Sequence, residues 1–273
     1  MRIGRRSGWQ EVGRDVFVRN YRTYDENVGL VLGEGAAMLV DTRSSHPQGA
    51  EILRDVREVT DLRPTVVVNT HYHFDHVYGN AVMLPCEIWG SEACALELRR
   101  HGEERRADLL PTLPARLRAE VTTVEIVPPD HLVRDRRTIR VGGRSVELRW
   151  EGRGHTDSDL LVIVPDAHVL FAGDLIEEGA PPSFGDAFPL DWPATVRHVA
   201  SLASGPVVPG HGKVVDRGFV ERQAADLAAV AAEARAAHEQ AIPEKEAARM
   251  VKLPPDFAAE AIRRAYAQLD GAI

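Results

Sequence analysis

The sequence predicts an α/β fold in which two β-sheets pack face to face with helices on the outside. Short apolar runs typical of strands occur in both halves of the chain, and segments with helical spacing lie between them. Strands that alternate with single helices in both halves suit two sheets whose outer faces are covered by helices. With 273 residues, 44% of them hydrophobic, the chain can bury such a core without disulfides.

The first half of the chain is expected to start with a β-hairpin, because apolar runs at residues 28–32 and 36–40 flank a glycine-containing turn. A helix is expected over residues 47–61, where apolar side chains recur at helical spacing and a proline suits the first turn. The continuous apolar run at 65–69 predicts a buried strand. A serine is placed to cap a further helix over residues 91–101.

The second half repeats this alternation. Residues 137–141 and 145–150 alternate between apolar and polar side chains and are joined through two glycines, which predicts a hairpin with one buried face. The elements expected after it are buried strands over 160–164 and 168–171, a helix over 191–202 and a short strand over 206–209.

Two segments depart from this pattern. Residues 102–120 are rich in Glu and Arg and contain two prolines, so they are expected to form a helical insert, and the sequence leaves open whether it acts as a lid. The Ala-rich tail is expected to be helical and broken at Pro243 and at the Pro254–Pro255 pair. We therefore predict a main domain over residues 1–215 and a C-terminal helical extension, 216–273, that packs on the same domain.

Composition and charge restrict the partners that we expect. The formal net charge is -8, and an acidic surface repels phosphate backbones, so nucleic acid is not an expected partner. No apolar run is long enough for a membrane span, and the basic start of the chain lacks the apolar stretch of a secretory signal. The two cysteines, Cys86 and Cys94, suit free thiols in a reducing compartment. We expect a cytoplasmic protein that acts on a small molecule, and its oligomeric state stays open.

The segment directly after the strand predicted at 65–69 is dense in metal-binding side chains. His71, His73, Asp75 and His76 lie within six residues. Imidazole nitrogens and carboxylate oxygens are the ligands that Zn²⁺ takes in proteins. Because His71 and His73 are two residues apart, they can face one metal from an extended segment, while Asp75 and His76 can face a second metal from a turn.

Three further candidate ligands lie where predicted strands end. His155, Asp174 and His211 each stand beside a glycine, which allows the backbone to approach closely. Rigid scaffolds often present catalytic groups at such positions. Each residue alone is weak evidence for a ligand, but together with the dense first motif they indicate a metal centre.

These motifs, in this order, resemble the metallo-β-lactamase-fold hydrolases. The resemblance covers residues 28–212, and it implies a four-layer αβ/βα sandwich, here with extra C-terminal helices. It also implies a role for Asp41, because Leu39–Thr42 looks like the family segment whose aspartate supports a metal ligand. An ordinary turn aspartate is the alternative for Asp41.

The resemblance implies a role for each ligand. The first metal would be held by His71, His73 and His155, the second by Asp75, His76 and His211, and both by a bridging Asp174. One β-lactamase subclass has a cysteine ligand where this chain has Asp174, so that subclass is excluded. Flavodiiron proteins carry a glutamate where His73 stands, so glyoxalase II-like and other metallo-hydrolases are the closer match.

The function implied is hydrolysis with two zinc ions, or with iron or manganese in their place. A hydroxide that bridges the metals would attack the carbonyl of an ester, thioester, lactone or lactam. Asp75 would act as the catalytic residue that orients the hydroxide or passes a proton to the leaving group. The sequence does not choose among these substrates, and it shows no obvious basic cluster for the carboxylates of a glutathione thioester.

Two other functions stay open at this stage. A mononuclear iron oxygenase of the persulfide dioxygenase type would use fewer of the seven ligands. A fold retained only for binding would be expected to have lost ligands, and none is missing here.

Aromatic residues near the predicted metal centre are candidates for substrate contacts. Phe184, Phe188 and Trp192 follow Asp174 on a Pro-rich loop, and Tyr21 and Tyr24 lie on a segment that could overhang the site. The alternative is that these side chains pack the loops onto the sandwich. Asp186 lies in the same loop but belongs to no recognisable motif.

Overall fold

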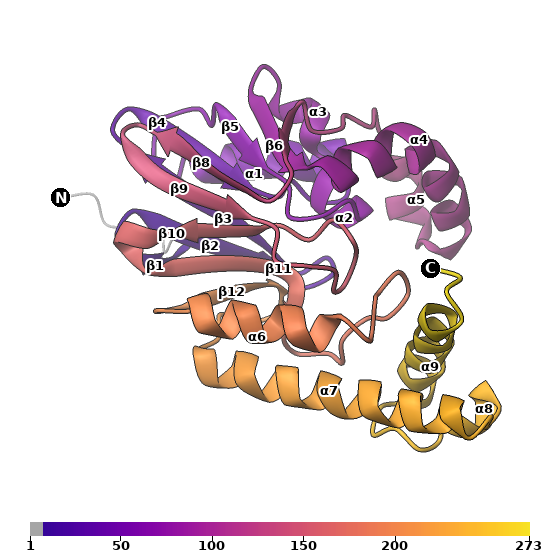
Figure 1. Ribbon diagram of the computed structural model, residues 1–273. Helices are drawn as coiled ribbons and strands as arrows, with labels where there is room; N and C mark the ends of the chain where they lie inside the picture. The colour runs from indigo at the N-terminus through magenta and orange to yellow at the C-terminus, as the bar shows by residue number, and fades with distance from the viewer. Residues whose placement is uncertain (1–7) are drawn as a thin grey trace.

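The computed structural model describes residues 8–273, and Figure 1 shows its layers. The expectation that the chain starts without a secretory signal rests mainly on residues 1–7, which lie outside the described residues. In the described part, strands form two layers with helices on both outer sides: α1 to α5 lie on one side and α6 and α7 on the other, with α9 beside the end of α7 (Figure 1). This is the four-layer αβ/βα sandwich that the sequence predicts.

The first sheet contains the strands of the N-terminal half. In spatial order its members are β1 (Gln10–Gly13), β2 (Val16–Tyr21), β3 (Glu26–Gly33), β4 (Ala36–Val40), β5 (Val66–Val68), β6 (Glu87–Ser91) and β7 (His131–Val133). The pairs from β1 to β4 are antiparallel, and those from β4 to β7 are parallel.

The second sheet contains the strands of the C-terminal half. In spatial order its members are β12 (Val207–His211), β11 (Val169–Glu177), β10 (Leu161–Val164), β9 (Arg144–Arg149) and β8 (Arg136–Val141). The pairs are antiparallel except β11 with β12, which is parallel. The two sheets are joined where His211 of β12 pairs with Glu26 of β3, so the twelve strands of the described residues form one continuous hydrogen-bonded sheet folded into two layers.

Apolar side chains from both sheets fill the space between them. The cluster joins Val31 and Met38 of the first sheet to Val146, Leu148 and Phe171 of the second, and all five are at most 2% exposed. Burying this apolar surface is the main term that holds two sheets face to face. The rigid sandwich fixes the strand ends from which the candidate ligands project.

The helices of the N-terminal half differ in length from the expectation. Helix α1 (His46–Val56) is capped by the Ser45 hydroxyl, which accepts a hydrogen bond from the Gln48 N–H, and it ends five residues before the predicted boundary at 61. Helix α4 (Glu92–Leu109) is capped by Ser91 as predicted but continues beyond residue 101. The predicted insert is therefore the end of α4, a 3₁₀ turn (Leu110–Thr112) and α5 (Ala115–Thr122).

The insert is packed rather than loosely attached. Leu113, Leu117 and Val121 are buried and form one apolar cluster with Leu98 of α4 and Val77 of α2 (Phe74–Val77). Helix α3 (Asn80–Met83) follows α2 directly. Whether the insert moves as a lid stays a prediction.

The tail forms the helices that the sequence predicts. Helix α7 (Arg217–Glu239), the short α8 (Glu244–Ala247) and α9 (Pro255–Leu269) are separated at the predicted prolines. They share one apolar cluster with β11 and with α6 (Trp192–Leu202). The division at residue 215 into a main domain and an extension stays a prediction. None of the helices in residues 8–273 combines the length and the apolar character that a bilayer span requires.

Candidate metal centre

The dense motif divides between two kinds of backbone. The buried strand β5 ends at Val68, and the chain then runs through His71 and His73 before α2 begins at Phe74. Asp75 and His76 lie in this short helix, so they leave the backbone in other directions than His71 and His73 do. The two pairs therefore face different positions, as the spacing predicts.

A first group of four potential ligands converges at the edge of the sandwich. His73 Nδ1 lies 3.1 Å from His71 Nε2 and 2.9 Å from His155 Nε2. Asp174 Oδ2 lies 3.7 Å from His71 Nε2 and 3.5 Å from His155 Nε2. One ligand atom from each residue falls within 4.8 Å of all the others, which is the arrangement expected around one ion.

A second group of three potential ligands lies beside the first. His76 Nε2 and His211 Nε2 are 3.3 Å apart. Asp75 Oδ2 lies 3.8 Å from the first nitrogen and 3.6 Å from the second. These atoms also lie within 4.8 Å of one another.

Asp174 lies between the two groups. Its Oδ2 is 3.1 Å from His211 Nε2, and its Oδ1 is 3.4 Å from His76 Nε2. Contrary to the expectation that Asp174 follows a strand, it lies inside β11, where the pairing with β12 shifts register on both sides of Gly173. The positive φ of Gly173, 52°, is a conformation that glycine adopts readily, and the shift turns Asp174 toward the histidines.

The donor set fits divalent zinc. Zinc bonds to imidazole nitrogen and carboxylate oxygen are about 2.0–2.2 Å long, so tetrahedral ligand atoms are roughly 3.3–3.6 Å apart. The separations within each group, 2.9–3.8 Å, bracket that value. Together, the seven residues can supply ligands to two ions.

Asp41 contacts a ligand of the second group directly and a ligand of the first group through Thr70. Its Oδ2 is 2.9 Å from His76 Nδ1. It also accepts hydrogen bonds from the Thr70 amide and hydroxyl, and that hydroxyl lies 3.1 Å from His71 Nδ1. If each Nδ1 carries the proton and donates it outward, each Nε2 keeps a lone pair that points into the metal group.

The partners of the other three histidines are not marked by any motif. His73 Nε2 lies 3.0 Å from Asp186 Oδ2, and His155 Nδ1 lies 3.4 Å from Glu177 Oε1. His211 Nδ1 donates to the Tyr24 carbonyl at 2.8 Å. Four of the five histidines thus have a hydrogen-bonding partner on the side away from the group, and His155 Nδ1 has the Glu177 carboxylate near it without a hydrogen bond. The sequence analysis missed Asp186, and its place on the loop after Asp174 is the only signal that could have pointed to it.

Arg105 of α4 connects the insert to this site. Its Nη1 donates to Asp186 Oδ2 at 2.8 Å, its Nε binds Glu97 at 2.6 Å, and its guanidinium lies over the Tyr72 ring. Asp186 therefore joins the insert to His73. The Arg105 and His73 contacts hold the pKa of Asp186 below its usual range despite burial, which keeps the carboxylate charged.

The histidines differ in how their surroundings shift their pKa values in the metal-free protein, even within one group. Burial, together with the neighbouring His76, lowers the pKa of His71 well below its usual value. Burial also opposes the charging of His155 and His211, but nearby carboxylates outweigh it and raise the pKa of His155 to about 9 and that of His211 to about 10. Glu177 and Asp174 act on His155, and Asp174 and Asp75 act on His211.

Glu26 is a buried acid that the sequence analysis missed. It is fully buried beside the second group, and neither carboxyl oxygen has a hydrogen-bond partner among the described residues. Burial raises its pKa well above the usual value, and Arg43 Nε lies 3.7 Å away. Its position at the pairing of β3 with β12 explains why no local motif marks it.

The candidate substrate-contacting residues are either buried in the core or at least partly exposed. Phe184 and Trp192 are at most 1% exposed and pack the loop onto the core, the alternative that the sequence left open, and Trp192 also packs against the His155 ring. A substrate contact by either residue stays a prediction. Tyr21 is 5% exposed and bonds Asp55, and Phe188 is half-buried beneath Arg153. Tyr24 is 41% exposed next to the second group and remains the best candidate.

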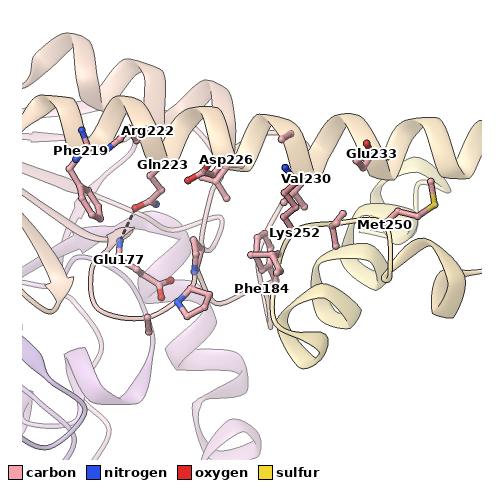
Figure 2. Close-up of a pocket in the computed structure, with 17 residues that line it drawn as sticks. Glu177, Phe184, Phe219, Arg222, Gln223, Asp226, Val230, Glu233, Met250 and Lys252 are labelled. Atoms are coloured by element: carbon pink, nitrogen blue, oxygen red, sulfur yellow. Dashed lines mark hydrogen bonds between the residues drawn. The ribbon is translucent and has the colours of Figure 1, made fainter.

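Three cavities border the site. A pocket of about 150 Å³ includes His73, Tyr72 and Phe74 in its wall. A second, of about 710 Å³, lies between α7 and the loop after β11, and Figure 2 shows Glu177 at one end of it, with its amide bonded to Gln223. A third, of about 1090 Å³, begins at Tyr24. Of the seven candidate ligands, only His73 is among the residues that line these three cavities.

Comparison with known proteins agrees with this geometry. The family model of the metallo-beta-lactamase superfamily matches residues 22–211. A metallo-beta-lactamase type 2 from Bacillus cereus is 28% identical over 201 residues, which cover 70% of this chain and 69% of the relative. The acyl-coenzyme A thioesterase MBLAC2 of Homo sapiens is 25% identical over 233 residues, 78% of each chain.

Solved structures share the fold. A metallo-beta-lactamase from Pontibacter korlensis has a TM-score of 0.67 at 21% identity and covers 81% of this chain and 98% of its own. A double mutant of the sec-alkyl sulfatase PisA1 has a TM-score of 0.78 at 16% identity and covers 98% of this chain but 51% of its own. The second likeness therefore extends over the C-terminal helices as well.

Proposed function

The chain belongs to the metallo-β-lactamase superfamily, and from this premise we propose that it is a binuclear zinc hydrolase that cleaves a thioester. The observation that carries the proposal is the pair of converging ligand groups with Asp174 between them. A site that held one ion would need only the first group. Here the second group is equally compact, and its histidines also have acceptors behind them.

Two zinc ions at this site would lower the pKa of water enough to supply hydroxide at neutral pH, and would polarise the carbonyl oxygen of the substrate. The residues around them orient the reactants. Asp75 is 8% exposed at the first turn of α2, so it can accept a proton from the attacking water and pass it to the leaving thiolate. The C–S bond breaks, and the products are a carboxylic acid and a thiol.

Among the possible substrates we choose a thioester, because one of the similar proteins is a thioesterase. The human acyl-coenzyme A thioesterase aligns over 78% of both chains, further than the Bacillus cereus lactamase does. Both belong to a family in which one metal site serves several carbonyl substrates. Esters, lactones and lactams are therefore the other substrates to assay.

The rival function, a mononuclear iron oxygenase, makes a different prediction for metal content. Two zinc ions per chain are expected after purification without added metal, whereas the oxygenase would carry one iron. Elemental analysis separates the two. One iron and no zinc, together with oxygen consumption, would replace the hydrolase proposal.

The activity test uses the zinc-loaded protein and four acyl substrates of matched size: a thioester, an oxygen ester, a lactone and a β-lactam. We expect the thioester to be hydrolysed fastest, and Asp75→Asn to lower kcat at least a hundredfold, because the proton acceptor is removed while the shape is kept. A control variant, Asp61→Asn, changes an exposed carboxylate in the segment before β5, outside both ligand groups, and should keep full activity. Turnover of none of the four substrates would refute the proposal.

A further inference from the structure

The largest cavity near the metal groups is rich in arginine. It lies between the β2–β3 turn, α1 and α5, and we call it the arginine cleft. Its charged lining residues are five arginines and two glutamates: Arg19, Arg22, Arg43, Arg54, Arg116, Glu51 and Glu120. The excess of positive charge is notable in a chain whose net charge is -8.

The arginines of the cleft divide into those with and those without partners. Arg19 pairs with Asp55 at 3.2 Å, and Arg43 pairs with Glu51 at 2.7 Å. By contrast, Arg22 and Arg54 are exposed and make no ion pair within the described residues. Two guanidinium groups therefore face the cleft with their charge uncompensated.

The floor of the cleft also contains unsatisfied polar groups. Arg43 and Gln48 line the cleft and are at most 8% exposed, yet Gln48 Oε1 has no hydrogen-bond partner in the described structure, and Arg43 Nε has no hydrogen bond and only the Glu26 carboxylate 3.7 Å away. Arg43 also has a positive φ of 70°, which is uncommon for a residue with a side chain. Unpaired buried polar groups and backbone strain of this kind are found at binding sites more often than in ordinary cores.

The cleft leads to the metal groups through Tyr24. The Tyr24 side chain lines the cleft, its carbonyl accepts the hydrogen bond from His211, and its ring packs edge-on against Phe74, the residue before Asp75. A molecule that lies in the cleft can thus place one end at Tyr24, beside the second ligand group. The other end would reach the uncompensated arginines.

We propose that the arginine cleft binds a phosphate-bearing carrier of the substrate, and that the thioester at the end of that carrier reaches the metal groups past Tyr24. The assignment rests on the proposed thioester hydrolysis. Guanidinium groups bind phosphate in a bidentate way, so exposed and unpaired arginines suit phosphate oxygens. The cleft, at about 1090 Å³, is as large as the sites that enclose whole cofactors. A nucleotide-linked thiol such as coenzyme A has this size and charge.

A binding experiment tests the cleft without any turnover. The probe is adenosine 3′,5′-bisphosphate, which carries phosphates but no thioester and no thiol, titrated into the zinc-loaded protein by calorimetry. We expect binding that weakens with salt, and at least a tenfold rise in Kd for Arg22→Ala/Arg54→Ala. The control is Arg100→Ala, which removes an exposed arginine of α4 outside the cleft and should leave Kd unchanged. Absence of binding, or an equal Kd in the double variant, would overturn the assignment.

A kinetic experiment then distinguishes substrate binding in the cleft from the hydrolytic step at the metal groups. Acetyl-coenzyme A is compared with S-acetyl-N-acetylcysteamine, which keeps the thioester but lacks phosphate. The double variant should raise KM for acetyl-coenzyme A at least tenfold with little change in kcat, and should leave the phosphate-free thioester unaffected. A glutathione thioester, which carries carboxylates instead, should also be unaffected, and a larger effect on it than on acetyl-coenzyme A would overturn the assignment to phosphate.

The two proposals fail in different ways. If no thioester is hydrolysed but the nucleotide still binds through Arg22 and Arg54, the hydrolysis proposal fails and the cleft assignment holds. If both acetyl thioesters are hydrolysed and the double variant changes their KM values by the same factor, the hydrolysis proposal holds and the cleft assignment fails.

Discussion

At the scale of single residues, hydrogen bonds behind the ligands determine which nitrogen faces the metal group. His73 differs from the other four histidines because it offers Nδ1 inward and Nε2 outward. Its outer acceptor, Asp186, is held by Arg105 from a distant part of the chain. The orientation of His73 therefore depends on a carboxylate and a cation outside the ligand motif.

We predict that Asp186→Ala weakens zinc binding by the first group about 10–100-fold, the usual effect of removing an outer partner of a metal ligand. His73 would lose the acceptor that fixes its ring. Zinc affinity is measured by competition with a chelator, and Asp61→Ala serves as the control because Asp61 is exposed. An unchanged affinity in Asp186→Ala would mean that packing alone orients His73.

A second residue-scale prediction concerns protons. Because the pKa of His155 is raised to about 9 and that of His211 to about 10, both imidazoles are protonated at pH 7 in the metal-free protein. Zinc binds only neutral imidazole, so its binding must release these protons. Apparent zinc affinity should rise with pH from 6 and level off only above the pKa of His211, about 10.

Calorimetry in buffers of different ionisation enthalpy counts the protons released. We expect at least three per protein at pH 7 when both sites fill, one each from His155, His211 and His76, because Asp174 and Asp41 also raise the pKa of His76 well above its usual value despite burial. In His155→Ala the count should fall by about one. Zinc uptake at pH 7 without proton release would contradict the raised pKa values.

At the scale of elements, the register shift between β11 and β12 brings the two halves of the site together. Asp174 projects from β11, and the neighbouring Gly210 of β12 lies so close that a Cβ atom at residue 210 would overlap Asp174 Oδ1. His211 is the next residue of the same strand. The close approach of β12 to Asp174 thus requires glycine at position 210.

We predict that Gly210→Ala displaces the Asp174 carboxylate and lowers zinc content from two ions to one, because His71, His73 and His155 can still hold a single zinc. Activity should fall at least a hundredfold, or about 2.7 kcal/mol of barrier. Gly185→Ala is a matched control, since a Cβ atom at that position meets no atom within 4 Å. Two zinc ions and full activity in Gly210→Ala would show that Asp174 can move without loss.

The elements also show what the sequence could and could not predict. Hairpins with clear alternation, such as β8–β9, were predicted closely, whereas β7 has three residues, too few for a periodic pattern. The seven candidate ligands could be identified because they are dense or lie beside glycines near strand ends. Asp186, Glu26 and the arginines of the cleft could not, because tertiary contacts between distant segments bring them to the site.

At the scale of the whole molecule, the candidate site joins the two halves of the chain. His71, His73, Asp75 and His76 come from the first half, and His155, Asp174 and His211 come from the second. The sheets of the two halves pair at Glu26 and His211, directly beside the second ligand group. Bound metal would therefore cross-link the halves and add its binding energy to the stability of the sandwich.

The C-terminal helices share an apolar cluster with β11 and α6 of the sandwich. Ile262 of α9 is fully buried in the cluster that also contains Leu227 of α7, Val199 of α6 and Leu175 of β11. A core that spans a sheet and three helices should unfold in one step with the sandwich. One-step unfolding is what we expect if the extension at 216–273 packs on the main domain.

We predict that Ile262→Ala lowers the free energy of unfolding by about 2–5 kcal/mol, since it leaves a cavity in this cluster, without changing zinc content. The matched control, Arg263→Ala, changes the next and exposed residue of α9 and should alter stability by no more than about 0.5 kcal/mol. Urea unfolding is followed both by the fluorescence of the four tryptophans, Trp9, Trp89, Trp150 and Trp192, and by far-ultraviolet circular dichroism. Coincident transitions that shift together in Ile262→Ala would support one cooperative unit. If the helical signal alone shifts while the fluorescence transition stays in place, the extension folds separately from the sandwich, and the division at residue 215 is a true domain boundary.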